Sequence, residues 1–252
     1  MGISYNTYGE CPYVKNNTFI GQDPETEPLP LYREIRGRLP RPVWDGHEDV
    51  IPCYDYAWET AFGNLRRPNP EAGFVTNFID TAFNGCLFMW DTAFIAMYGR
   101  YASRIFNFQK SLDNLYARQY PNGFICREIW EEEKGESFHM YDPSSTGPNI
   151  LAWSEWQYYE QTKDLKRLKR VFDPILAYHL WMKENRPDVF NAAHQLGHLN
   201  TYIYKRLTGV FATDPTNASM TGMYNTVTGD GWSKEICQTF GIPMEMLPPI
   251  YE

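Results

Sequence analysis

The spacing of apolar residues changes after Pro187, and this change constrains the fold more than any other feature of the sequence. Before it, apolar residues recur at three- and four-residue spacing, first at Ile51, Tyr54, Trp58 and Phe62. That period is typical of amphipathic helices. After Pro187, short apolar runs alternate with stretches rich in Thr and Gly. The sequence therefore predicts helical hairpins up to about residue 186 and a smaller α/β region beyond it.

Helix-ending residues refine this expectation. Pro68 and Pro70 should end the first helix, which begins near Glu48. Asp173 and Pro174 fit the cap and the first position of a helix, so a new helix is expected to start there. Further helices are predicted over residues 91–101, 105–116, 149–162, from 165, 200–207 and 233–240. Residues 1–43 are expected to form an extended arm or loops, 128–147 a polar loop and 210–213 a strand.

Charge and cysteine content exclude several classes of function. The 252 residues carry a formal net charge of −8 and lack the basic character of a nucleic-acid-binding protein. The five cysteines form no CxxC pair, so neither a zinc site nor a disulfide framework is expected. No apolar run is long enough to span a membrane, and the first residues do not resemble a signal peptide. We therefore expect a cytoplasmic protein without nucleic-acid or membrane partners.

Four motifs follow one another between residues 88 and 186. They read FMWDTAF at 88–94, QYPNGFI at 119–125, GPNILAW at 147–153 and LAYHLWMKENR at 176–186. In this order and spacing, residues 44–186 resemble the six-hairpin glycosidases, which include trehalases and mannosyl-oligosaccharide glucosidase-like hydrolases. The resemblance implies a mainly α fold, a partial (α/α)6 toroid of helical hairpins.

The same resemblance implies a carbohydrate-binding site. In that family the aspartate of the Trp-Asp pair hydrogen-bonds hydroxyls of the sugar, which gives this role to Trp90 and Asp91. Trp153 is expected as a stacking wall, and Asn122 completes the predicted substrate-binding residues. A carboxylate accepts hydroxyl hydrogen bonds and an indole face matches a sugar face, so the chemistry agrees. The alternatives are that Asp91 is a helix N-cap and that the aromatic rings only fill the core.

No catalytic residue is predicted. Glycoside hydrolysis needs a protonated carboxyl and a second carboxylate. In the six-hairpin family the acid follows the Trp-x-x-Glu-Asn-Arg stretch and the base lies far downstream, but here the glycosidase pattern stops after Arg186. Glu128, Glu131 and Asp142 lie in the right kind of loop, yet their spacing singles out none of them. An inactive, sugar-binding portion is the expectation.

A second set of motifs covers the last part of the chain. They read NTYIYKRLTG at 200–209, FATDPTNAS at 211–219 and GIPMEMLP at 241–248. Residues from about 181 to 252 thereby resemble the FGGY carbohydrate kinases, a family that includes xylulokinase, gluconokinase and glycerol kinase. The resemblance implies a fragment of their N-terminal domain, with a small α/β part of a ribonuclease-H-like fold.

The kinase resemblance also bears on cofactors. A complete member of that family uses ATP and Mg²⁺, an Asp-x-Gly-Thr loop near its N-terminus and a catalytic aspartate. Residues 1–20 hold no Asp-x-Gly-Thr, and the position of the aspartate is expected beyond residue 252. Asp214 and Asn217 are therefore interpreted as turn-forming residues. No cofactor or metal is expected for this chain unless the kinase hypothesis applies to a complete enzyme.

The two resemblances overlap at residues 181–186, which suggests a crossover through recombination, an assembly error or deliberate splicing. The expected organisation is an extended arm or loops over residues 1–43, a glycosidase-like fragment over 44–186 and a kinase fragment over 187–252. Incomplete domains expose apolar faces, so low stability and self-association are predicted. The leading hypothesis is a glycosidase-like sugar-binding portion without activity. The alternatives are a carbohydrate-kinase fragment, a sugar-binding module and an assembly artefact.

Overall fold

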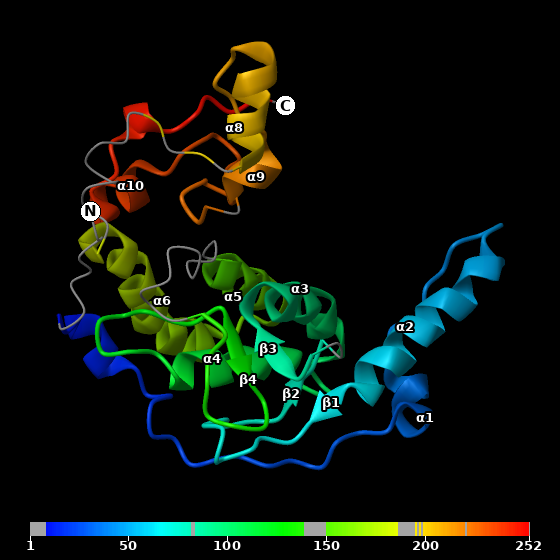
Figure 1. Cartoon of the computed structure of the whole chain (residues 1–252). Coiled ribbons are helices and arrows are strands. Elements are labelled where there is room, and N and C mark those ends of the chain that lie inside the picture. The colour runs from blue at the N-terminus through cyan, green and yellow to red at the C-terminus, as the bar shows by residue number, and fades with distance from the viewer. Residues whose placement is uncertain are drawn as a thin grey trace.

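The computed structural model describes residues 9–81, 84–138, 150–185, 195, 197, 199–219 and 221–251. Figure 1 shows a helical body, which comprises the described residues up to 185, and a C-terminal lobe formed by residues 199–219 and 221–251. The α-helices are α1 (Tyr32–Ile35), α2 (Ile51–Gly63), α3 (Met89–Gly99), α4 (Asp113–Ala117), α5 (Ile150–Thr162), α6 (Leu165–Asn185), α8 (Leu199–Thr208), α9 (Pro215–Ser219) and α10 (Lys234–Phe240). The short 3₁₀ helices are η1 (Pro12–Asn16), η2 (Arg36–Arg38), η3 (Glu48–Val50), η4 (Arg100–Ala102), η5 (Phe108–Leu112) and η6 (Met244–Met246).

The helices of the body largely follow the predicted periodicity. α2 and α5 form where they were expected, although α2 ends at Gly63, before the prolines. α3 begins two residues earlier than predicted, at Met89. The expected helix over 105–116 is divided into the 3₁₀ segment η5 and the short α4. α3 packs against both α5 and η5, and α5 packs against α6.

The prediction that Pro174 starts a new helix is wrong, because α6 continues through it. Proline lacks the amide hydrogen and removes one helical hydrogen bond. The Pro174 carbonyl accepts a hydrogen bond of 2.8 Å from Gln119 Nε2. Val171, Ile175 and Trp181 lie on the buried face of α6. Burial of this face holds the helix together across the proline.

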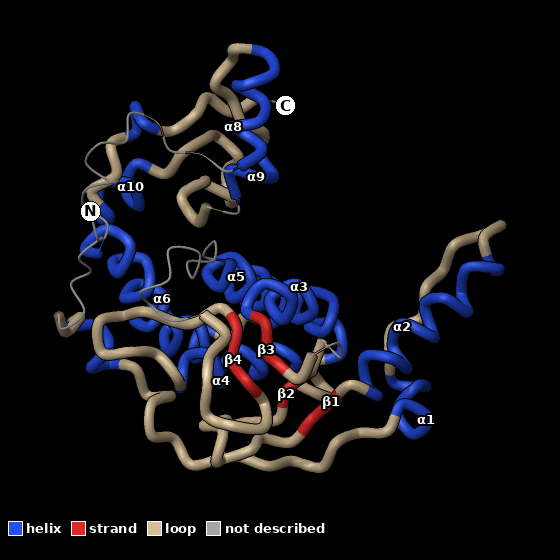
Figure 2. The backbone as a smooth tube through the Cα atoms, in the orientation of Figure 1, coloured by secondary structure: helices blue, strands red, loops and turns tan. Residues whose placement is uncertain are grey.

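Two small antiparallel sheets lie in the body, and neither was predicted. β1 (Leu65–Arg66) pairs with β2 (Phe78–Ile79), and β3 (Cys86–Phe88) pairs with β4 (Glu128–Trp130). Figure 2 shows these strands as short segments between the helices. Strands of two or three residues carry no detectable alternation, so sequence reasoning placed β4 in a polar loop.

Residues 9–43 do not form an extended arm alone, because part of this segment packs on the body. Cys11 and Phe19 are buried, and the Cys11 amide donates to the Pro121 carbonyl. Asn17 Nδ2 donates to the Tyr116 carbonyl at 3.0 Å. The guanidinium of Arg170 on α6 lies 3.7 Å from the centroid of the Phe19 ring. The segment is therefore an integral layer of the helical body.

A buried ion network joins three helices of the body. Arg167 on α6 donates two hydrogen bonds of 2.8 Å to Glu155 on α5 and one of 2.8 Å to Asp113 on α4. Tyr116 donates to the same Glu155 carboxylate at 3.1 Å. All of these side chains are buried. Because one guanidinium is hydrogen-bonded to both carboxylates, the network fixes the relative positions of α4, α5 and α6.

The C-terminal lobe has local caps and turns but little core. Ser233 accepts a hydrogen bond from the Ile236 amide and starts α10, and Gly241 ends it in the left-handed conformation, as predicted. The Trp232 indole donates to the Pro248 carbonyl at 2.8 Å. The predicted strand at 210–213 is reduced to one parallel bridge, between Thr213 and Ile250.

The overall class is mainly helical, with small antiparallel sheets in the described residues. The partial toroid and the ribonuclease-H-like fold remain predictions. Among the helices that the structure describes, none is long and apolar enough to cross a membrane. The predicted Gly147-Pro148-Asn149 motif and Asp142 lie outside the described residues.

Candidate functional site

A cavity of about 620 Å³ lies between α2, the end of β2 and the start of α3. Its size falls within the range of pockets that hold small organic ligands, about 300–1,000 Å³. It contains Trp90 and Asp91, two of the four predicted sugar-binding residues. The lining residues are Tyr56, Ala57, Thr60, Ala61, Asn64, Ile79, Asp80, Thr81, Trp90, Asp91, Phe94, Ile95 and Tyr98.

The start of α3 places Trp90 and Asp91 in this cavity. β3 leads directly into the helix, whose N-cap is Phe88, so Asp91 is the third residue of the helix. The alternative that Asp91 is the N-cap is therefore wrong. Its charge is nevertheless favourable in the first helical turn, near the positive end of the helix dipole. Trp90 is 41% exposed, which leaves indole surface open to a ligand.

Trp153 and Asn122 lie elsewhere. The Trp153 ring contacts Phe94 at a centroid distance of 5.5 Å, and Phe94 contacts Trp90 at 5.1 Å. Trp153 is thus joined to the cavity through Phe94 without lining it. Asn122 is buried in the turn after α4, where its side-chain oxygen accepts from the Phe124 amide at 3.1 Å. The structure brings Trp90 and Asp91 together and places Asn122 in a structural turn.

Sequence reasoning named Glu131 as one of three possible catalytic carboxyl groups but missed Asp80, its partner at the edge of this cavity. Asp80 follows β2, is 7% exposed and lines the cavity. Glu131 follows β4 and hydrogen-bonds to Asp80, and Arg66 lies 3.8 Å from the Asp80 carboxylate. Burial, together with the charge of Asp80, raises the pKa of Glu131 to about 8. Glu131 is therefore mostly protonated at neutral pH, because its ionisation would place a second partly buried charge beside Asp80.

This pair does not fit the geometry of glycoside hydrolysis. The two carboxyl groups of a glycosidase lie about 5–9.5 Å apart, with the sugar or a water between them. Asp80 and Glu131 are in hydrogen-bond contact, which leaves no room for either. What the cavity offers is a set of hydrogen-bond acceptors in Asp80 and Asp91, hydroxyl and amide groups in Thr60 and Asn64, and an exposed indole face. That combination suits recognition of a polyhydroxylated ligand.

The described residues contain no group of three His, Cys, Asp or Glu side chains placed to hold a metal ion. We assign no step to a metal–nucleotide complex. All five cysteines are free, and four of them are buried. Burial raises the pKa of the Cys86 and Cys126 thiols to about 11, which keeps both protonated and unreactive at neutral pH.

In the C-terminal lobe, Asp214 and Asn217 serve local structure, but they cap and extend the short helix α9 and do not form the predicted turn. The Asp214 carboxylate accepts a hydrogen bond of 3.0 Å from the Asn217 backbone amide and a second one from the Asn217 side chain. Asp214 thereby caps the N-terminus of α9. Burial acts to raise the pKa of Asp214, but the hydrogen bonds from Asn217 outweigh it and lower the pKa. The conspicuous polar residues of this motif are therefore committed to local structure.

Comparison with known proteins supports one of the two resemblances. Residues 160–252 match the FGGY family of carbohydrate kinases, N-terminal domain. The match begins before residue 181 and so includes α6, which packs in the helical body. It does not reach residues 44–159, on which most of the resemblance to six-hairpin glycosidases rests. That resemblance stays a prediction. No solved structure matches the chain.

Three curated relatives have kinase names. An autoinducer-2 kinase of Photorhabdus laumondii is 33% identical over 73 residues, which are 29% of this chain and 14% of the relative. A glycerol kinase of Mycoplasma capricolum is 41% identical over 139 residues, 48% of this chain and 26% of the relative. A xylulose kinase of Bacillus subtilis is 26% identical over 113 residues, 45% of this chain and 22% of the relative. The chain thus spans a quarter or less of the length of most of these relatives.

Proposed function

We propose that residues 160–252 are the segment of a carbohydrate kinase of the FGGY type, and that the associated reaction is ATP-dependent phosphorylation of a small sugar or polyol. The match over these residues carries the proposal, and three relatives with kinase names support it. The substrates in those names are glycerol, xylulose and autoinducer-2, and glycerol and xylulose are small and rich in hydroxyl groups. A hydroxyl is the group to which a kinase transfers the γ-phosphoryl.

Phosphoryl transfer depends mostly on positioning and charge neutralisation, which several parts of a kinase supply together. The described residues hold neither a metal cluster nor a free aspartate in the kinase motifs, since Asp214 caps α9. We therefore expect the 252-residue chain by itself to be a poor catalyst. The proposal concerns the reaction to which this segment belongs.

The test is sugar-dependent ADP release by the full chain with ATP and Mg²⁺. Glycerol, xylulose and glucose are offered separately, and the rate without any sugar is the baseline. A rate above this baseline with glycerol or xylulose supports a kinase function of the chain itself. If no sugar raises ADP release and none protects the chain against thermal unfolding, the kinase proposal is wrong for this chain.

A second function rests on the cavity at the start of α3: we propose that the helical body binds a carbohydrate there. The observation that favours it is the exposed indole of Trp90 beside Asp91 and Asp80. A pyranose presents an apolar face to such an indole and hydroxyl hydrogens to the carboxylates. Because Asp80 and Glu131 are too close for hydrolysis, we propose binding without cleavage.

Isothermal titration of the full chain with glucose, mannose and trehalose tests this second function. Trp90→Ala should weaken binding about fivefold to tenfold through the loss of stacking. Asp91→Asn should weaken it about tenfold or more, because hydrogen bonds to a charged acceptor are stronger than those to an amide. Trp44→Ala is the matched control, since Trp44 is also exposed, at 58%, but does not line the cavity. Equal affinities for all three variants would contradict the assignment.

A further inference from the structure

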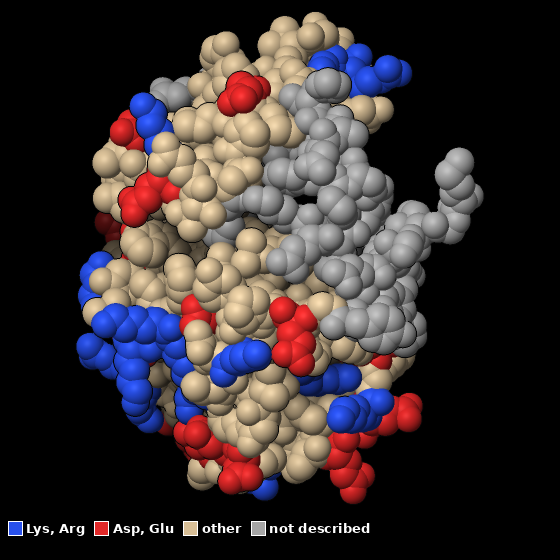
Figure 3. Space-filling model, turned by 90° about the vertical axis from the view of Figure 1, so that its left-hand side faces the viewer, with Lys and Arg blue, Asp and Glu red and all other residues tan. Residues whose placement is uncertain are grey.

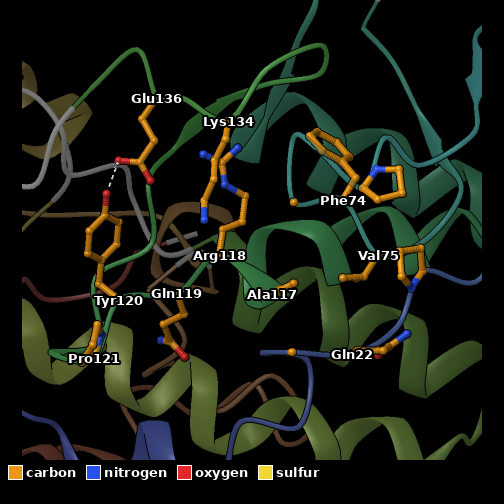
Figure 4. Close-up of a pocket in the computed structure, with 14 residues that line it drawn as sticks. Gln22, Phe74, Val75, Ala117, Arg118, Gln119, Tyr120, Pro121, Lys134 and Glu136 are labelled. Atoms are coloured by element: carbon orange, nitrogen blue, oxygen red, sulfur yellow. Dashed lines mark hydrogen bonds between the residues drawn. The ribbon is translucent and has the colours of Figure 1, made fainter.

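A second cavity, of about 510 Å³, lies between the N-terminal segment, the loop before β2 and the end of α4. Figure 4 shows how its side chains are arranged. Phe74, Val75 and Ala117 form an apolar wall, while Arg118 and Lys134 bring two positive charges to the cavity. Neither function proposed above uses this cavity.

The two cations lie at the same end of the cavity. Arg118 Nη2 donates a hydrogen bond of 2.7 Å to the carbonyl of Gly135, the residue next to Lys134. Nη1 of Arg118 is buried and has no hydrogen-bond partner among the described residues. Lys134 is exposed and makes no ion pair or hydrogen bond with any described residue. Two adjacent like charges that share no ion pair repel each other, and an anion between them would offset that repulsion.

The acidic groups nearby do not neutralise this pair. Glu136 also lines the cavity, but no oxygen of its carboxylate lies within ion-pair distance of Arg118, and it accepts a hydrogen bond of 2.9 Å from Tyr120. Burial lowers the pKa of Arg118, and the charge of Glu136 offsets part of this effect. Glu131, Glu132 and Glu133 precede Lys134 in the loop, yet none of them lines the cavity.

The combination of groups determines the chemistry of the ligand. A guanidinium and an ammonium on different elements suit a dianion with several oxygens, which is the description of a phosphate monoester. The carboxylate of Glu136 is an acceptor that repels a bare anion but accepts hydrogen bonds from hydroxyl groups. The volume accommodates a phosphate with a small organic body.

We propose that this cavity binds the phosphate monoester of a small sugar or polyol. The phosphate contacts Arg118 and Lys134, and a hydroxyl group of the ligand donates to Glu136. The proposal stands on this cavity alone and does not depend on either function proposed above.

The experiment is isothermal titration of the full chain with glycerol 3-phosphate and glucose 6-phosphate, and separately with inorganic phosphate, glycerol and glucose. Arg118→Gln and Lys134→Gln should each weaken binding of the phosphate monoester about tenfold or more, as expected for the loss of a charge-assisted contact. Lys169→Gln is the matched control, because it removes the same charge from an exposed residue that does not line the cavity. Lys134→Gln alters an exposed side chain, so its result does not depend on refolding of the core.

Binding of a phosphate monoester that is lost in both cavity variants and retained in Lys169→Gln supports the proposal. Absence of binding by both monoesters overturns it, as do equal affinities in Lys134→Gln and the unmodified chain. Inorganic phosphate that binds as tightly as glycerol 3-phosphate overturns the part played by Glu136. Binding of glycerol or glucose that matches the affinity of their phosphates and is retained in Trp90→Ala overturns the role of the two cations.

Discussion

The helical body and the C-terminal lobe belong to one chain but bury their apolar side chains very differently. The body has two large buried clusters, and the twelve largest fully buried side chains all lie in it. In the described part of the lobe few apolar side chains are buried, and most of them are small: Ala212, Ala218, Cys237 and Leu247. The lobe meanwhile exposes Tyr202, Ile203, Tyr204, Leu207 and Val210 on and after α8.

The lobe therefore shows that a region can have well-formed local structure and still have little buried apolar area to stabilise it. The lobe has well-formed caps at Ser233 and Gly241, so its short helices satisfy their own backbone groups. Caps contribute only about 1 kcal/mol each, whereas buried apolar area supplies most of the free energy of folding. Figure 3 shows broad areas without charged side chains in the upper part of the molecule, where Figure 1 places the lobe. We expect the body to unfold cooperatively and the lobe to open at low free energy.

Arg167→Ala should have the largest effect and should destabilise the body alone. It leaves Glu155 and Asp113 buried without their counter-charge, which costs about 3–5 kcal/mol. Urea denaturation with hydrogen exchange measures the loss separately in body and lobe. Lys166→Ala is the control, because it removes a positive charge of α6 from an exposed side chain that makes no ion pair with a described residue. If lobe amides lose protection as strongly as body amides, the two regions unfold together, and the lobe does not open independently of the body.

Gly123→Ala should also destabilise the body, by about 2–4 kcal/mol from backbone strain and overpacking. Gly123 has a φ of 99°, and an added Cβ would lie 2.3 Å from the Ala177 carbonyl oxygen on α6. Gly46→Ala provides the comparison, since Gly46 has a φ of 79° but no atom within 4 Å of the added Cβ. Thermal melts should show a clearly larger fall in Tm for Gly123→Ala. Similar falls would mean that contact with α6 contributes nothing.

Glu131→Gln should stabilise the body at alkaline pH. The pKa of Glu131 is raised to about 8 in the folded chain, above its usual 4.5, so folding favours the protonated carboxyl. Stability attributable to this group is complete below about pH 4.5 and falls as the pH rises towards 8. After allowance for partial solvent screening, the gain in the variant at pH 9 is about 1–2 kcal/mol. Thermal melts at pH 6 and pH 9 measure this gain, and Glu133→Gln at an exposed position is the control. An unchanged pH dependence of stability in Glu131→Gln would refute the raised pKa of Glu131.

Leu207→Gln should have the smallest effect on stability, below about 0.5 kcal/mol, because the side chain is 80% exposed. Its effect on association should be larger, since it lies among the exposed apolar residues of α8. Sedimentation velocity over a range of concentrations measures self-association. Val43→Gln, outside the lobe at a position that is 88% exposed, should leave association unchanged. A monomeric unmodified chain at all concentrations would remove the basis for this prediction.

Sequence reasoning located the helices and part of the candidate site, for identifiable reasons. α10 has clear caps, apolar residues recur at helical spacing in α2, α5 follows a Gly-Pro pair, and Trp90 and Asp91 stood out through their motif. The continuation of α6 through Pro174 was not predictable, because it depends on the burial of its apolar face in the body. Asp80 and Glu131 are far apart in sequence and meet only through tertiary packing. The single available hint was a polar residue at the end of the apolar run that contains β2.

The position of α6 has a consequence for anyone who wishes to excise the kinase-like segment. Similarity to the FGGY family begins at residue 160, yet Arg167, Val171 and Trp181 of that segment are held by partners that precede it. A protein that starts at residue 160 would contain α6 without the residues that bury its apolar face. It would also lack both carboxylates, Glu155 and Asp113, that pair with Arg167. The start of the similarity to the kinase family and the start of the folded unit that contains α6 therefore lie at different residues.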